Sequence, residues 1–318
     1  MRRTVQSGAP ESAARVWAPL ARFVESEAQI GTWAEQRRWT HAYYEFVRFG
    51  IKQGWACLFG ALLLALLIGT HLVYPRGAWL PRYDFLVIAA VAIQVAMLAF
   101  KLETWEEAKV ILIFHAVGTA MEIFKTSVGS WIYPEPSILR IGGVPLFTGF
   151  MYACVGSFIA RVWRILAFRF TRFPPLWAQI LLAVAIYVNF FTHHYVWDAR
   201  VLLFALTALL FGRCWVHFKV WQVHRRMPLL VGFALVALFI WFAENIGTFT
   251  AAWIYPHQRH AWSLVSLGKL GAWFLLMIIS YVLVAMVNKP RAMPAVDGVR
   301  RDPVPPAGVV GLRPQMLS

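Results

Sequence analysis

The sequence predicts an all-α polytopic membrane protein of about eight transmembrane helices, arranged as two parallel four-helix repeats. Two observations indicate membrane spans. Hydrophobic residues make up 60% of the 318 residues and charged residues only 14%, where a soluble chain has nearly twice that charged share. Eight apolar segments are also about 20 residues long, the length that crosses a bilayer. A third observation, a motif that occurs twice, indicates the repeats.

We expect the spans near residues 50–73, 84–101, 108–128, 143–165, 176–196, 199–218, 228–250 and 262–287. The first repeat then covers residues 49–165 and the second covers residues 166–288. Residues 1–48 form a polar N-terminal segment, in which residues 15–48 alternate charged and aromatic residues. This pattern is typical of amphipathic helices that lie on the membrane surface or pack on loops. The proline-rich tail, residues 289–318, is expected to be disordered.

The basic residues indicate an orientation in the membrane. The net charge is +15, and most lysines and arginines flank alternate ends of the spans. By the positive-inside tendency this places both termini in the cytoplasm, and the protein in the inner (cytoplasmic) membrane. We expect the lipid bilayer, and no nucleic acid, as its partner, because no basic patch exists apart from these flanks. No apolar run precedes residue 49, so we expect no cleavable secretory signal.

The repeated motif is E-x3-T-x4-W-I-Y-P, which runs from Glu122 to Pro134 and again from Glu244 to Pro256. Two further pairs of matching dipeptides support a duplication: Thr70-His71 with Thr192-His193, and Tyr83-Asp84 with Trp197-Asp198. Four spans per repeat is an even number, so both copies have the same orientation. We therefore expect an axis along the membrane normal to relate them.

The two glutamates are the first candidates for chemistry. If the helix continues to the tryptophan, each lies roughly 13 Å from it, inside the hydrocarbon. A carboxylate there costs about 2.5–3.5 kcal/mol, so Glu122 and Glu244 need a partner or a function. One interpretation is a functional site. The other is a buried hydrogen-bonded pair that joins the halves, with Thr126 and Thr248 contributing.

Two other ionisable residues lie in the predicted spans. Lys269, between Gly268 and Gly271, is close in depth to Glu244, so we expect an ion pair. His115 is seven residues before Glu122 and therefore on the same helical face. It either belongs to the site or is a hydrogen-bonded packing residue.

A rim of polar residues is expected at the outer ends of the spans, and it could hold a metal ion: His71, Asp84, His193, His194 and Asp198. The alternative is a set of wet interfacial residues, with the two aspartates as helix N-caps. No HExxH or CxxC spacing is present. The three cysteines, Cys57, Cys154 and Cys214, lie in or beside apolar spans and suggest neither a disulfide framework nor a metal site. The sequence indicates no cofactor and no oligomeric state.

Two resemblances follow from these residues. The strings HAVGTAMEIFKTSVGSWIYPEPS, from His115, and FAENIGTFTAAWIYPHQ, from Phe242, resemble an uncharacterised bacterial integral membrane family, the domain-of-unknown-function family 817, over roughly residues 40–290. Around the first copy, Glu122, Gly129, Trp131, Tyr133 and Gly143-Val144-Pro145 are similar to a pattern in carotenoid hydratase-like membrane proteins. That resemblance implies acid/base glutamates facing a polyene or isoprenoid.

Three functions remain open. The favoured hypothesis is a membrane-embedded enzyme that acts on a lipophilic substrate, isoprenoid, carotenoid-like or lipid, with acid/base roles for Glu122, Glu244, Lys269 and His115. The second is a transporter that uses the same glutamates as a proton or cation relay. The third is a structural membrane protein. No GxGxxG, P-loop or Ser-His-Asp arrangement supports ATP-driven or serine-hydrolase chemistry.

Overall fold

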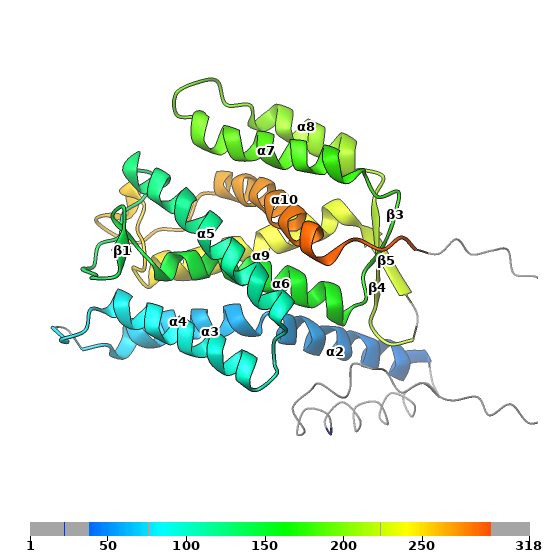
Figure 1. Cartoon of the computed structure of the whole chain (residues 1–318), viewed down its shortest axis with the longest axis horizontal. Helices are drawn as coiled ribbons and strands as arrows, with labels where there is room; N and C mark the ends of the chain where they lie inside the picture. The colour runs from blue at the N-terminus through cyan, green and yellow to red at the C-terminus, as the bar shows by residue number, and fades with distance from the viewer. Residues whose placement is uncertain (1–21, 23–37, 76, 223, 294–318) are drawn as a thin grey trace, which may run out of the picture.

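Figure 1 shows a computed structural model of the chain, which describes residue 22 and residues 38–75, 77–222 and 224–293. The expected surface helices before residue 38 and the proline-rich tail from residue 294 lie outside the described residues. The helices are α2 (Arg38–Ala56), α3 (Leu58–Val73), α4 (Arg82–Ala99), α5 (Trp105–Ser127), α6 (Phe147–Ile165), α7 (Leu176–Thr192), α8 (Arg200–Phe211), α9 (Leu229–Phe249), the short 3-10 helix η2 (Pro256–Gln258) and α10 (Gly268–Asn288).

The helices lie roughly along the longest axis of the molecule (Figure 1). We call the end that carries residues 131–134 and 253–256 the W-I-Y-P end, and the opposite end the sheet end. Proline comes directly before three helices: Pro81 before α4, Pro175 before α7 and Pro228 before α9. Proline fits at the start of a helix because the backbone N–H that it lacks would have no hydrogen-bond partner within the helix. Thr104 begins α5 with a reciprocal capping box to Glu107.

Among the described residues, four helices are long and apolar enough to cross a membrane: α4, α5, α9 and α10. A fifth span results if α2 and α3 are counted as one, although they bend by 66° at Cys57. The expected first span, residues 50–73, is therefore a bent pair. α7 and α8 are shorter apolar helices of 17 and 12 residues. The structure thus confirms a helical protein with four or five candidate spans. It does not confirm the predicted eight spans or the two four-helix repeats.

The outer surface of the helices is apolar. Large hydrophobic side chains that a soluble protein would bury are exposed along several helices, among them Val95, Leu112, Leu181, Leu209 and Phe239. Contiguous apolar surface of this kind marks contact with lipid. These helices and their surface are those of a multi-pass membrane protein in a lipid bilayer.

A small antiparallel sheet closes the sheet end, which the all-α prediction did not include. It consists of β3 (Arg169–Thr171), β4 (Trp215–Lys219) and β5 (His224–Pro228), in the order β3-β4-β5. The expected span at 199–218 ends early because α8 stops at Phe211, before Gly212. A second, two-stranded sheet of β1 (Arg140–Ile141) and β2 (Val144–Pro145) lies at the W-I-Y-P end.

Glycines let α5 and α6 pack closely, and this packing positions the candidate site. A Cβ on Gly118 of α5 would lie 2.6 Å from the ring of Tyr152, and a Cβ on Gly156 of α6 would lie 2.6 Å from the ring of Phe114. Small residues allow such close approach between membrane helices. The ring of Tyr152 therefore crosses α5 at Gly118, one turn below Glu122.

Candidate functional site

Each repeated segment turns back on the helix that precedes it. α5 ends at Ser127, and Gly129 then adopts a positive φ of 72°. α9 ends at Phe249, and Ala251 takes the corresponding place with a φ of 52°. Such left-handed residues commonly end helices. The chain thus reverses before each tryptophan, where the sequence-based estimate of 13 Å assumed a continuous helix.

Glu122 lies at the centre of the first copy. Its carboxylate accepts hydrogen bonds from Trp131 Nε1 at 2.7 Å, from the hydroxyl of Tyr133, and from the hydroxyl of Tyr152 at 2.7 Å. The side chain is buried, with 5% of the residue exposed. The three donors come from two places, the turned-back segment and α6. The carboxylate therefore ties its own W-I-Y-P segment both to α5 and to α6.

Glu244 has the matching arrangement in the second copy. It accepts hydrogen bonds from the hydroxyl of Tyr255 and from Trp273 Nε1 at 2.5 Å. Tyr255 belongs to the turned-back segment, and Trp273 belongs to α10, as Tyr152 belongs to α6. The residue is also buried, at 4% exposed. Each glutamate thus has one donor on the following long helix, which the sequence analysis did not identify.

The two W-I-Y-P segments pair with each other. Ile132 and Ile254 form an antiparallel bridge in which each backbone N–H donates to the other's carbonyl oxygen at 3.0 Å. The ring of Trp131 packs edge-on against that of Tyr255, with centroids 6.0 Å apart. The glutamates themselves are not bonded to each other. They are connected through the segments that they hold.

Lys269 does not form the expected ion pair. It stands in the first turn of α10, and its Nζ lies 4.5 Å from the ring centroid of Tyr255 and 5.2 Å from that of Trp131. Within the described residues, no carboxylate oxygen comes within 4.0 Å of it. The helix begins at Gly268 rather than near residue 262, so Lys269 lies at the helix end, where it stacks on aromatic rings.

His115 lies apart from the glutamates. Its ring packs against Phe150 with centroids 4.5 Å apart, and its Nδ1 would lie 2.4 Å from a Cβ on Gly149. Nδ1 is buried and has no hydrogen-bond partner. The structure therefore places His115 two turns below Glu122 in the contact between α5 and α6, with no bond to the glutamate network.

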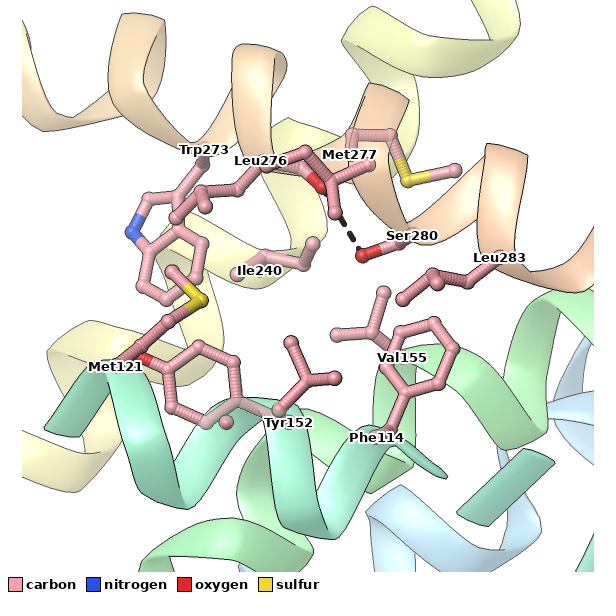
Figure 2. A pocket seen from close by; sticks show the side chains of 13 residues that line it. Phe114, Met121, Tyr152, Val155, Ile240, Trp273, Leu276, Met277, Ser280 and Leu283 are labelled. Carbon is pink, nitrogen blue, oxygen red and sulfur yellow. Dashed lines mark hydrogen bonds between the residues drawn. The ribbon is translucent and has the colours of Figure 1, made fainter. Parts of the chain in front are cut away.

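An apolar crevice ends at Tyr152 and Trp273, which donate to the two glutamates, and Figure 2 shows the side chains that line it. It lies among α5, α6, α9 and α10 and has a volume of about 30 Å³, about that of one water molecule. Figure 2 shows Tyr152 and Trp273 near one another at one end, with Ile240, Val155 and Leu283 along the rest. The two polar side chains at this end are the hydrogen-bond donors to Glu122 and Glu244.

The rim residues do not form a metal centre. Among the described residues, no three His, Cys, Asp or Glu side chains converge as metal ligands. Asp84 does not cap α4; its carboxylate accepts from the Ser137 hydroxyl and from the backbone N–H groups of residues 138 and 139. His71 packs near Phe249, with ring centroids 5.9 Å apart.

The remaining rim residues gather where α7 meets α8. The rings of His193 and His194 lie 4.1 Å apart. Asp198 accepts from the backbone N–H of Arg200, which begins α8, and its carboxylate forms a salt bridge of 3.1 Å to the Arg200 guanidinium. Burial raises the pKa of Asp198, but hydrogen bonds from Asn189 and Arg200 outweigh it and hold the pKa below its usual range.

A second buried polar cluster lies toward the sheet end, and the sequence analysis did not identify it. The Arg161 side chain is fully buried, with its guanidinium 3.3 Å from Glu103 and 3.6 Å from Glu107. Gln94 donates to Glu103 at 2.5 Å. Burial raises the pKa of Glu103 to about 7, although Arg161 attracts the ionised form. The cue in the sequence was Arg161 within an apolar segment.

Comparison with known proteins identifies the family. The chain is 45% identical over 250 residues to the uncharacterized protein YoaT of Bacillus subtilis (strain 168), a match that covers 79% of this chain and 94% of YoaT. No solved structure matches the chain. The comparisons do not support the resemblance to carotenoid hydratase-like proteins. Residues 45–281 match the family model described as "Protein of unknown function (DUF817)", and the chain belongs to that family.

Proposed function

We propose that this chain is a membrane-embedded enzyme that acts on a lipophilic molecule at the end of the apolar crevice. One observation carries the proposal. Apart from Ser280, the crevice is lined by apolar side chains, and it ends on Tyr152 and Trp273. Each of these two donates a hydrogen bond to a buried glutamate. An apolar lining with a few converging polar groups is usual for a small-molecule site. Such sites measure about 300–1,000 Å³, so the helices around this crevice of about 30 Å³ must move apart to admit the substrate.

Tyr152 and Glu122 would supply the acid/base chemistry. The phenol oxygen lies 2.7 Å from the carboxylate, within proton-transfer reach. When Glu122 is protonated, Tyr152 can give its proton to a group in the crevice and take one from Glu122 in return. The indole of Trp273 can only donate a hydrogen bond, so it has no acid/base role in the proposal. Glu244 would hold this indole in position. Lys269 and His115 do not line this crevice and have no acid/base role in the proposal.

The repeats belong to this proposal. We take α3–α6 and α7–α10 as two copies of one four-helix unit, with eight membrane helices and both termini on the cytoplasmic side of the inner membrane. Corresponding helix pairs make contact in both halves. The contact of α5 with α6 corresponds to that of α9 with α10, and the contact of α3 with α6 corresponds to that of α7 with α10. The reciprocal bond between Ile132 and Ile254 is what a two-fold axis produces.

The transporter and structural alternatives have less support. The described helices contain no internal proline. The bend of 66° between α2 and α3 has no counterpart at α7 in the second half, whereas transporters typically have broken helices at corresponding positions of both halves. The hydrogen bonds of the glutamates do stabilise the W-I-Y-P segments, as a structural role requires. That role alone does not place two polar donors at the end of an apolar crevice.

Tyr152→Phe tests the proposal, because it removes one hydroxyl and keeps the ring. Wild type, Tyr152→Phe and the exposed control Tyr195→Phe would be expressed at equal levels in a host that lacks its own copy. Extracted lipophilic compounds are then compared by mass spectrometry with those of cells that carry an empty vector. We expect a compound whose level changes with wild type and with Tyr195→Phe, but not with Tyr152→Phe. A Tyr152→Phe profile equal to wild type would refute the role of the phenol.

A further inference from the structure

A second cavity lies at the W-I-Y-P end, separate from the crevice. Its volume is about 250 Å³, and residues of α5, α7, α8 and α10 line it. That volume holds about eight water molecules at roughly 30 Å³ each. Four basic side chains line the cavity: Lys125, His193, Arg200 and Lys269. No Asp or Glu residue does.

The two lysines bring positive charge that no carboxylate neutralises by contact. Lys125 is 4% exposed, and its Nζ lies 2.9 Å from Nε2 of His194 and 4.1 Å from the ring centroid of Phe190. Lys269 faces only aromatic rings, as described above. Within the residues that the structure describes, neither lysine has a carboxylate oxygen within 4.0 Å.

The nearby acidic groups are already engaged. Asp198 forms its salt bridge with Arg200 at the edge of the cavity. Glu244 directs its two oxygens to Tyr255 and Trp273. Counting Lys125, Lys269 and Arg200 against Asp198 leaves two positive charges among the side chains at the cavity, with the histidines neutral. Glu122 and Glu244 do not line the cavity, and their charges act on Lys269 only from beyond 4.0 Å.

The start of α10 adds to this positive field. Gly268 and Lys269 line the cavity, and the helix of 21 residues begins at Gly268 with no side-chain cap. The backbone N–H groups of Lys269 and Leu270 already donate to the carbonyls of Ser266 and Leu267, so the contribution of the helix to anion binding is the positive end of its dipole. The pKa of His194 shows the same field: burial lowers it, and the positive charges of Lys125 and Lys269 lower it further.

We propose that this cavity binds an anion of the phosphate class, between Lys125, Lys269 and Arg200. The anion is either a free solute or the headgroup of an anionic lipid, because both offer the same oxygens to these donors. Ile186, Phe190 and Leu275 also line the cavity, and these apolar side chains suit a short hydrocarbon substituent. The inference does not depend on the proposed enzyme activity.

Binding measurements with two probes test this inference. Purified protein in a neutral detergent is titrated with inorganic phosphate in one arm and with dihexanoyl phosphatidic acid in the other, by calorimetry. The variants are Lys269→Met and Arg200→Gln. The matched control is Arg259→Gln, an exposed arginine at the same end that does not line the cavity. Unfolding temperatures without anion establish that each variant is folded. If Lys269→Met does not fold, Arg200→Gln alone tests the cavity.

We expect saturable binding of at least one probe by wild type and by Arg259→Gln. Each cavity variant should weaken it by about tenfold or more, the factor that corresponds to about 1.4 kcal/mol. Binding of phosphate identifies a free anion as the ligand, and binding of phosphatidic acid alone identifies a lipid headgroup. Absence of binding of both probes at millimolar concentration, or equal loss in Arg259→Gln, would overturn the inference.

Discussion

Replacing Glu122 with glutamine tests the hydrogen-bond network at the first W-I-Y-P segment. One carboxylate oxygen accepts from Trp131 and Tyr133, and the other accepts from Tyr152. A glutamine has one acceptor oxygen, which must face the indole of Trp131 because an indole N–H only donates. Its amide N–H groups then face Tyr152, so that hydroxyl must turn and accept.

The expected cost follows from this rearrangement. The bonds from Trp131 and Tyr133 survive in weaker form, because bonds to a charged acceptor contribute about 1.5–3 kcal/mol and neutral ones about 1 kcal/mol. The Tyr152 proton loses its acceptor. We therefore expect Glu122→Gln to lower the free energy of unfolding by about 2–3 kcal/mol. Glu244→Gln should cost less, about 1–2 kcal/mol, because Glu244 has two donors and Tyr255 can accept.

Thermal unfolding in detergent measures the difference. At roughly 2–4 °C per kcal/mol, Glu122→Gln should lower the unfolding temperature by several degrees, and more than Glu244→Gln does. Glu106→Gln is the matched control, because Glu106 is exposed in the first turn of α5 and should shift the temperature little. An unfolding temperature for Glu122→Gln equal to that of wild type would refute the network of three donors.

Three further predictions concern packing, backbone conformation and pH. Gly247→Ala should destabilise the protein by about 1–3 kcal/mol, because the added Cβ would lie 2.1 Å from the Trp253 ring. Gly69→Ala, with open space around its Cβ, should stabilise it by about 0.5–1 kcal/mol. Thermal unfolding measures both. Gly129→Ala should cost about 1–2 kcal/mol from its positive φ alone, since nothing lies within 4 Å of its Cβ; an unchanged unfolding temperature would contradict that backbone conformation. The raised pKa of Glu103, about 7 against 4.5 when exposed, means that its contribution is complete below about pH 4.5 and is lost as pH rises through 7. Stability should therefore fall by about 2–3 kcal/mol between pH 5 and 8, and Glu103→Gln should remove that part of the dependence.

Much of the site follows from the sequence because its chemistry is local. The identical spacing from each glutamate to its tryptophan and tyrosine marked the segments that the structure brings together. The distance was wrong because α5 ends at Ser127 and Gly129 reverses the chain, and a glycine in this position did not by itself reveal the reversal. Ala251 gave no signal at all, since alanine seldom adopts a positive φ.

Contacts between distant segments could not be predicted. Tyr152 and Trp273 donate to the glutamates from 30 and 29 residues away, and only the packing of α6 on α5 and of α10 on α9 brings them there. Apolar spans all look alike in sequence, so nothing indicated which helices meet. The short strands of the sheet end were missed because Trp215–Lys219 continues an apolar run beyond the end of α8.

The apolar crevice is tested most directly by filling it. Val155→Phe places in the crevice a ring larger than its volume of about 30 Å³ and replaces neither Tyr152 nor Trp273, and its unfolding temperature establishes that it is folded. Val184→Phe makes the same substitution on the exposed face of α7. Lipophilic compounds that copurify with each variant are identified by mass spectrometry. A compound retained by wild type and Val184→Phe but lost from Val155→Phe is the predicted result. The same compounds, in the same amounts, on all three proteins would contradict a lipophilic substrate in the crevice.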